Sequence, residues 1–474
     1  MRSSAGCGTR PGKWGRHGHD AHQDTAPPPP PAAPGRIGRN PVRTVISGLR
    51  GDMANPLFRN AYALVANGAF TGLLGLVYWA LAALLYDHDP GVVGRNWAVI
   101  QAIMFVGGAT MLNFLLIRFV PQSAHHTGKL VLGCYGAGAA AALALALGFL
   151  LVVPPRAPVY AHLDGWLPGA WFLLLAVSWN LFNQQEAVFT GLRHATWVPV
   201  INLVFGVAKL ALLAVLALTL HPGDGIVLSW FVPVLVALVP VNAVIFGRLI
   251  PRHVQQTRAR AVPPTRAEIL RYFGGGYLGG IFQYASISLI PVVVTAHLHN
   301  AEVNAYFQMA WALGMMLELL ALTLSLSLTV EGSFDASVLA ASTRAALRRT
   351  FMLMTPTVAV VVALCPVALE LFGHGYAAQG APLLQLLALA VLPKAVIELY
   401  VGVLRVRSRT QAIAALQGAR FLGVLALVPL LFDGTHLATI GMVVLGINVV
   451  IAAAVLPSLR RACSATAPAA GGGA

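Results

Sequence analysis

Long apolar stretches alternate with short polar connections along most of the chain. Each stretch has about the 20 residues that a helix needs to cross the hydrocarbon core of a bilayer. The twelve stretches lie at 61–86, 96–119, 130–153, 166–190, 197–220, 226–249, 273–297, 304–330, 347–372, 381–404, 411–432 and 437–457. This pattern predicts an all-α polytopic membrane protein with 12 transmembrane helices.

The composition agrees with this fold class and adds two tails. Hydrophobic residues make up 57% of the chain and charged residues only 10%, which is too little charge for the surface of a soluble domain. A basic, Pro-rich segment at 1–52 cannot bury a core and is expected to be disordered. Met53 is an alternative translation start for this reason. A second disordered tail is expected at 461–474.

The charged residues follow an alternating order along the predicted connections. Arg and Lys gather in every second connection, most densely in a basic linker at 251–271, whereas Asp and Glu gather in the others. Because positive charge accumulates on the cytoplasmic side of membrane proteins, the order predicts that both termini are cytoplasmic. It also accounts for the net charge of +15 without a nucleic-acid partner.

The two halves of the chain are similar in the spacing of their charged residues. A shift of 212 residues superimposes Arg59 on Arg271, Glu186 on Glu398, Arg193 on Arg405 and Arg248 on Arg460. We therefore expect a six-plus-six duplication, in which 53–250 and 272–460 form two pseudo-symmetric six-helix lobes. Parallel repeats of this kind are typical of transporters that bind their substrate between the halves.

Six ionisable residues fall inside the predicted spans, where a central charge costs about 2.5–3.5 kcal/mol on insertion scales. They are Glu186, Lys209, Glu318, Lys394, Glu398 and Arg420. Such groups normally face a bundle interior or a wet cavity and indicate a functional pathway. Purely structural pairing is an open alternative: Lys394 and Glu398 are four residues apart and can pair on one helix face. Glu318 has no partner nearby in sequence and can be buried as a neutral acid.

The sequence contains no recognisable metal, cofactor or nucleotide motif. The four cysteines are scattered, and His297 and His299 lack further ligands nearby. The segment TGKL at 127–130 lacks both the first Gly and the Ser/Thr of a phosphate-binding loop. We therefore expect no metal site, no cofactor and no ATP hydrolysis.

Several segments resemble bacterial polysaccharide transporters of the multidrug/oligosaccharidyl-lipid/polysaccharide (MOP) exporter superfamily. They are NPLFRNAYALVANG, LNFLLIRFVP, AEVNAYFQMAWALG, LTVEGSFD and LFGHGYAAQGAPLLQLLALAVLPKAV. The resemblance covers about residues 53 to 460 and consists of diffuse hydrophobic patterns. It implies a MATE-like fold, with two lobes around a cavity that opens alternately to the two sides of the bacterial plasma membrane.

The resemblance also implies a function. Members related to O-antigen flippases move polyprenyl-diphosphate-linked oligosaccharides, which enzymes of cell-envelope polysaccharide and lipopolysaccharide biosynthesis make and use. Cations suit a diphosphate, so the expected head-group ligands are Lys209, Lys394 and Arg420. The residues expected to compensate charge or to bind a coupling ion, H+ or Na+, are Glu186, Glu318 and Glu398. The expected neutral residues of the cavity wall are Asn60, Asn67, Gln283 and Tyr284.

Two other functions are open alternatives. A cation-coupled multidrug or metabolite exporter of the same superfamily often has an acidic residue in its first span, which 61–86 lacks. A membrane glycosyltransferase would use Asp87 or Asp89, in the first predicted outer loop, as a base. Two acids in an outer turn also follow from the charge asymmetry of the loops, so we expect a transporter and not an enzyme.

Overall fold

The computed structural model describes residues 56–86, 89–219, 223–257, 268, 276–334, 339–407 and 409–464. The chain from Pro56 onward forms one compact unit. The regular structure of the described residues is entirely helical. The predicted disordered tail at 1–52, Asp87 and most of the basic linker lie outside the described residues.

The N-terminal half of this unit contains the elements up to Thr257. They are α2 (Pro56–Leu85), α3 (Pro90–Gly108), α4 (Leu112–Phe119), α5 (Thr127–Val152), α6 (Trp166–Gly191), α7 (Trp197–Thr219), α8 (Gly225–Val244) and α9 (Ile250–Thr257). A π-helical turn, Ile245–Leu249, joins α8 to α9.

The C-terminal half begins at Gly276. Its helices are α11 (Gly276–His297), α12 (Ala301–Phe334), α13 (Leu339–Glu370), α14 (Ala381–Val406), α15 (Thr410–Leu431) and α16 (Leu437–Ser464). A π-helical turn, Tyr376–Gly380, precedes α14.

The helices confirm a multi-pass membrane protein. Within the described residues, eight helical segments are long and apolar enough to cross a membrane, and the bent pair α3–α4 is a ninth if it counts as one span. The other three predicted stretches fall on α2, α6 and α12, so the full count of twelve spans stays a prediction. Large apolar side chains such as Leu151, Val239 and Val450 are more than two-thirds exposed, as expected for surfaces that face lipid.

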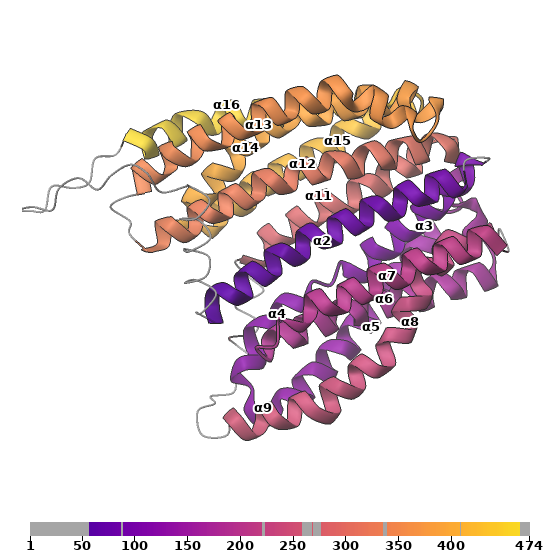
Figure 1. The fold of residues 1–474 in the computed structure, drawn as a ribbon, viewed down its shortest axis with the longest axis vertical. Coiled ribbons are helices and arrows are strands. Elements are labelled where there is room, and N and C mark those ends of the chain that lie inside the picture. The colour runs from indigo at the N-terminus through magenta and orange to yellow at the C-terminus, as the bar shows by residue number, and fades with distance from the viewer. Residues whose placement is uncertain are drawn as a thin grey trace, which may run out of the picture. The chain divides into compact units, whose positions relative to one another are not determined.

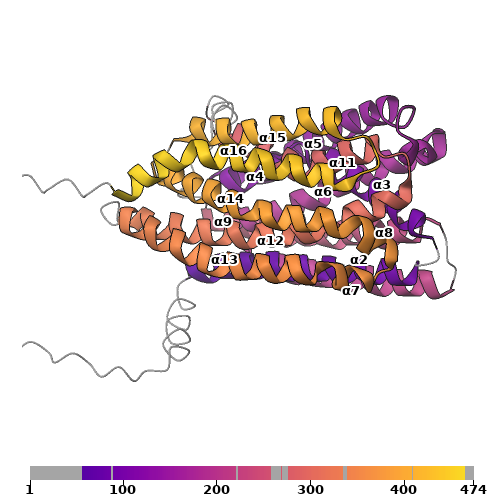
Figure 2. The same cartoon turned by 90° about the horizontal axis from the view of Figure 1, so that it is seen from above.

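The two halves meet along α3, α11 and α12. Figure 1 shows α11 and α12 between α2 and the last four helices, and the long helices run in a common direction in both views (Figures 1 and 2). The helix α3 packs against both α11 and α12, and α2 also contacts α12. These four helices therefore form the boundary at which a cavity between the halves can lie.

A break between α3 and α4 gives this boundary its shape. The two helices bend by 45°, and Met111 at the break has a φ of 46°, in the left-handed region that most side chains avoid. Asn180 of α6 donates hydrogen bonds from Nδ2 to the carbonyl of Gly107 (2.7 Å) and to the Thr110 hydroxyl (3.0 Å). The amide thus satisfies a carbonyl that the end of α3 leaves without a helical partner.

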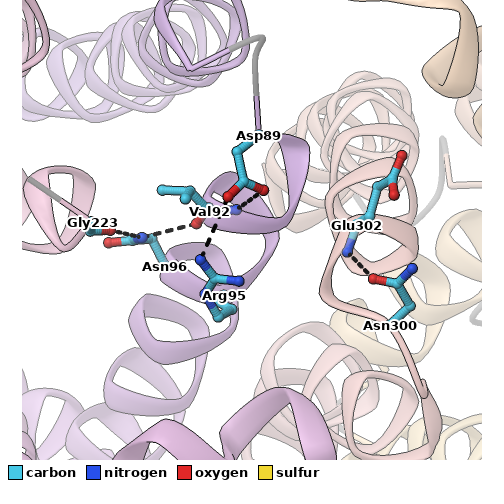
Figure 3. A network of polar contacts seen from close by, with 7 residues as sticks. All are labelled: Asp89, Val92, Arg95, Asn96, Gly223, Asn300 and Glu302. Carbon is cyan, nitrogen blue, oxygen red and sulfur yellow. Dashed lines mark hydrogen bonds and ion pairs between the residues drawn. The ribbon is translucent and has the colours of Figure 1, made fainter. Parts of the chain in front are cut away.

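The start of α3 is held against both α8 and α12 (Figure 3). Asn96 donates to the carbonyl of Gly223 (2.7 Å) and accepts from the Val227 amide (3.1 Å), which fixes α3 to the start of α8. Asn304 of α12 donates to the Gly94 carbonyl (2.8 Å). A Cβ on Gly94 would lie 1.7 Å from the Ala301 carbonyl oxygen, so the contact between the halves requires glycine here. We call this the Asp89 end of the bundle.

Candidate functional site: a charged cavity between the halves

A cavity of about 380 Å³ lies where the two halves meet. Its wall includes Leu76 and Trp79 of α2, Gln283 of α11 and, from α12, the methionines Met309 and Met316. Its volume is within the range of small-molecule sites, and its largely apolar wall with a few polar groups is typical of them. Four ionisable residues from three helices of the C-terminal half complete the lining: Glu318, Lys394, Glu398 and Arg420. We call this space the charged cavity.

The Lys394 ammonium on α14 forms an ion pair with the Glu318 carboxylate on α12. Both side chains are mostly buried, with 9% of Lys394 and 19% of Glu318 exposed. Lys394 therefore pairs with a residue of another helix. The charge of Glu398, which lies on the same helix as Lys394, also acts on the ammonium. Glu318, for which a neutral burial was an alternative, has a cationic partner.

Arg420 on α15 is the second cation of the charged cavity. Its side chain is buried, with 7% of the residue exposed, and its positive charge lies close enough to act on Lys394. None of the hydrogen bonds or ion pairs within the described part of the chain uses its guanidinium. A buried guanidinium with no protein partner is costly, so Arg420 is a candidate ligand for an anion that enters the cavity.

Lys209 lies elsewhere, inside the N-terminal half. Its ammonium is 3.6 Å from the ring centroid of Trp230, 4.8 Å from that of Tyr78 and 5.2 Å from that of Phe205. These rings belong to α8, α2 and α7, so the cation contacts three helices through cation–π interactions. Lys209 is not among the residues that line the charged cavity, although Trp79 of the cavity wall packs against Trp230. The sequence did not indicate this aromatic environment, because Tyr78 and Trp230 lie on other helices and only Phe205 is near Lys209 along the chain.

The other predicted site residues are divided among several places. Glu186 on α6 accepts a hydrogen bond from the Asn202 side chain on α7 and does not line the charged cavity. Gln283 lines that cavity. Tyr284 donates to the Met104 carbonyl (2.7 Å) and lines a second, separate cavity. Asn60 and Asn67 belong to α2, but their side chains lie outside the described residues.

Asp89 has a structural position at the start of α3. It is the N-cap residue, its Oδ1 accepts a hydrogen bond from the Val92 amide (3.2 Å), and its Oδ2 is 3.8 Å from Arg95 (Figure 3). Capping of this kind is the ordinary use of an aspartate before a helix. Among the described residues, no group of three or more His, Cys, Asp or Glu side chains could hold a metal ion.

A group of amide side chains on α6 was not predicted as part of a site. Asn180, Asn183 and Gln184 line the second cavity, at the break between α3 and α4. The segment WNLFNQQE at 179–186 places four amides in an otherwise apolar span, and this density was the available signal. Because polar side chains are costly to place in contact with lipid, these amides indicate a polar environment inside the bundle.

No family model and no curated protein sequence matches the chain. Solved structures do match it. An inward-facing multidrug resistance MATE family transporter of the MOP superfamily aligns with a TM-score of 0.59 at 15% identity, over 85% of this chain and 96% of that protein.

The chain has the MOP exporter fold.

Two further structures agree with this assignment. The lipid II flippase MurJ in an inward closed conformation aligns with a TM-score of 0.59 at 12% identity, over 84% of this chain and 87% of MurJ. A MATE in complex with MaD5 aligns with a TM-score of 0.56 at 13% identity, over 88% and 97%. At these identities the likeness concerns the fold. The all-α class predicted from the hydropathy pattern and the MATE-like fold implied by the resemblance are thereby confirmed.

Proposed function

We propose that this MOP-fold protein is a flippase or exporter for a polyprenyl-diphosphate-linked oligosaccharide or a related polysaccharide precursor. The protein would work by alternating access in the bacterial plasma membrane, with both termini and the basic connections cytoplasmic and the Asp89 end outside. A proton or Na+ gradient would drive transport if consumption of the cargo on the outer side does not drive it. The cargo would come from the membrane enzymes of cell-envelope polysaccharide biosynthesis.

The observation that supports this proposal best is the buried guanidinium of Arg420 beside Lys394 in the charged cavity, for which no described residue provides a hydrogen bond or an ion pair. Arg binds phosphate oxygens through paired hydrogen bonds, and Lys adds a point charge. We assign the diphosphate to Arg420 and Lys394. Glu318 neutralises Lys394 in the structure, and an arriving diphosphate would compete with this carboxylate for the ammonium.

The role of Lys209 differs from that of the other two cations under this proposal. The aromatic rings around it already stabilise its charge, and it holds α2, α7 and α8 together. We therefore assign it to the packing of the N-terminal half. Its substitution should affect stability more than binding of the diphosphate.

The test is binding and movement of a polyprenyl diphosphate in liposomes that contain the purified protein. Arg420→Gln should weaken binding of the lipid at least about tenfold and slow its movement between leaflets, because one charge-assisted contact is lost. Lys209→Met is the matched control, since it removes a buried cation that lies outside the cavity. Equal binding by wild type and Arg420→Gln would refute the head-group assignment.

A cation-coupled drug exporter is the second candidate, and one observation favours it: two carboxylates, Glu318 and Glu398, line the same cavity. An organic cation would pair with these acids. Drug efflux that is lost with Glu318→Gln, together with no movement of the lipid diphosphate, would establish this function in place of the first. A glycosyltransferase has less support, because Asp89 is used as a helix cap.

A further inference from the structure

A second cavity, of about 170 Å³, lies at the break between α3 and α4. Its polar lining comes from three parts of the chain and consists of Thr110, Asn113, Asn180, Asn183, Gln184, Tyr284 and Ser288. Trp179 supplies an aromatic side chain, and none of the residues that line this space is charged. We call it the amide cavity. A neutral ligand that forms many hydrogen bonds suits such a wall, whereas a charged ligand would find no counter-ion there.

Two amides of this cavity have unused hydrogen-bonding capacity. Gln184 is only 2% exposed, and its Nε2 donates to Asn180 Oδ1 (2.6 Å), but its Oε1 is buried without a partner among the described residues. Asn183, which also lines the space, makes no hydrogen bond to any other described residue. Buried polar atoms in proteins are almost always satisfied. The buried oxygen of Gln184 is therefore a candidate ligand for a hydroxyl group, and the half-buried amide of Asn183 offers such a ligand both donors and an acceptor.

The close packing of α5 keeps the amides in place. A Cβ on Gly138 of α5 would lie 2.3 Å from Gln184 Nε2 and 2.5 Å from Asn180 Oδ1. On its other side, Asn180 is anchored to the end of α3 through Gly107 and Thr110. The donors and acceptors of the amide cavity are thus held in fixed positions before a ligand arrives, which reduces the entropic cost of binding.

The helix α11 forms a wall of both cavities. Gln283 and Ile287 line the charged cavity, and Tyr284 and Ser288 line the amide cavity. Residues four apart lie on one face of a helix, so each pair marks one face of α11. Successive residues of a helix point about 100° apart, so the two cavities border neighbouring faces of α11. One ligand with a charged part and a neutral polar part could reach both.

We propose that the amide cavity binds a neutral, hydroxyl-rich sugar ring of the cargo. This inference rests on the proposed function and adds a chemical class for the glycan. Asn183 can donate from its N–H group to one sugar hydroxyl and accept at its oxygen from a neighbouring one, and Gln184 can accept from a hydroxyl at Oε1. Trp179 offers an apolar face to the ring C–H groups. The neutral wall selects an uncharged hexose over a uronic acid, because a buried carboxylate would lose its solvation without gaining a cation.

Three lipid probes test this proposal on the full-length protein in nanodiscs. They are bare polyprenyl diphosphate, the same lipid with one glucose, and the same lipid with one glucuronic acid. We expect the wild type to bind the glucose lipid about tenfold more tightly than either of the others. Asn183→Ala and Gln184→Ala should reduce this preference to less than about twofold while binding of the bare lipid stays unchanged. Arg420→Gln should weaken all three to a similar extent.

The controls separate this site from the proposed function. Asn300→Ala removes an exposed amide at the Asp89 end and should bind all three lipids as the wild type does. Asn183→Ala removes no hydrogen bond within the described part of the chain, so its thermal unfolding should match the wild type even if Gln184→Ala unfolds early. The sugar site is overturned if the wild type shows no preference for the glucose lipid, or if Asn183→Ala shows the same preference as the wild type. In either case Arg420 keeps its assignment as a ligand of the diphosphate.

If no lipid binds to the wild type, the proposed function fails and the sugar site is tested alone. Methyl glucoside then serves as the probe in saturation-transfer NMR. Transfer to the sugar that Asn183→Ala abolishes supports the site. Equal transfer for both proteins, or no transfer at all, overturns the proposal.

Discussion

The ion pair between Glu318 and Lys394 allows a quantitative prediction about stability. Both side chains are less than one-fifth exposed, and removal of one partner of a buried pair typically costs about 3–5 kcal/mol because it leaves a buried charge. The cavity gives Glu318 some contact with solvent, so we expect about 3 kcal/mol for Glu318→Gln and for Lys394→Met. The double variant, which has neither charge, should lie within about 1 kcal/mol of the wild type.

The assay is a double-mutant cycle on reversible unfolding in mixed micelles. The coupling energy from the four free energies of unfolding should be at least about 2 kcal/mol, which is in the range for residues in direct contact. Glu318→Gln has a second expected effect: it should tighten binding of bare polyprenyl diphosphate about tenfold, because the lipid no longer competes with a carboxylate for Lys394. Additive single effects, or a weaker affinity for the lipid in Glu318→Gln, would refute the reasoning.

Three further predictions concern the Asp89 end and its loops. Gly94→Val should destabilise the contact between the halves by at least about 2 kcal/mol, because even a Cβ would overlap the Ala301 carbonyl. Separation of the halves would make a cysteine placed at position 301 more accessible to a thiol reagent. Gly133→Val is the control, because the space around Gly133 is open. Asp89→Ala should lower the free energy of unfolding by about 1 kcal/mol, because a helix cap is lost, and should leave lipid movement unchanged. Loss of all activity in a variant that still folds would instead favour the glycosyltransferase. Hydrogen bonds from His436 and from the Thr435 and His436 amides hold the pKa of Asp433 below its ordinary value. A carboxyl group whose pKa is lowered by folding stabilises the folded protein at pH values above its ordinary pKa, and this stabilisation is lost as the pH falls below that value. The fall in Tm between pH 6 and pH 3 should therefore be smaller in Asp433→Asn than in the wild type. An equal fall in the two proteins would contradict the assignment.

The fold could be predicted from the sequence because the bilayer makes a strong demand on composition. A spanning helix needs a long apolar stretch, and each predicted stretch falls on a helix of the structure. The break between α3 and α4 was not predicted. It lies within one of those stretches, and hydropathy does not register the left-handed conformation of Met111 or the Asn180 amide that supports it.

The candidate site could be predicted only in part. The cost of charge in a membrane identified Glu318, Lys394, Glu398 and Arg420, and the structure places these four around one cavity. The partner of Lys394 could not be derived, because Glu318 is 76 residues away and is brought close only by the packing of α12 on α14. Lys209 has the same sequence signature as Lys394 and a different environment. Charge alone does not distinguish a cation held by aromatic rings from one that faces a cavity.

The position of α11 has a consequence for the energetics of the whole molecule. The same helix borders both cavities through neighbouring faces, so α11 cannot shift without changing the shape of both spaces. A ligand that displaces Gln283 and Ile287 must therefore change the space beside Tyr284 and Ser288. Thermodynamic linkage makes this effect reciprocal: occupancy on one side changes the affinity on the other by the same factor. An inhibitor that fills either space alone would alter the cooperativity of the pair, and binding isotherms for one ligand would shift in the presence of the other.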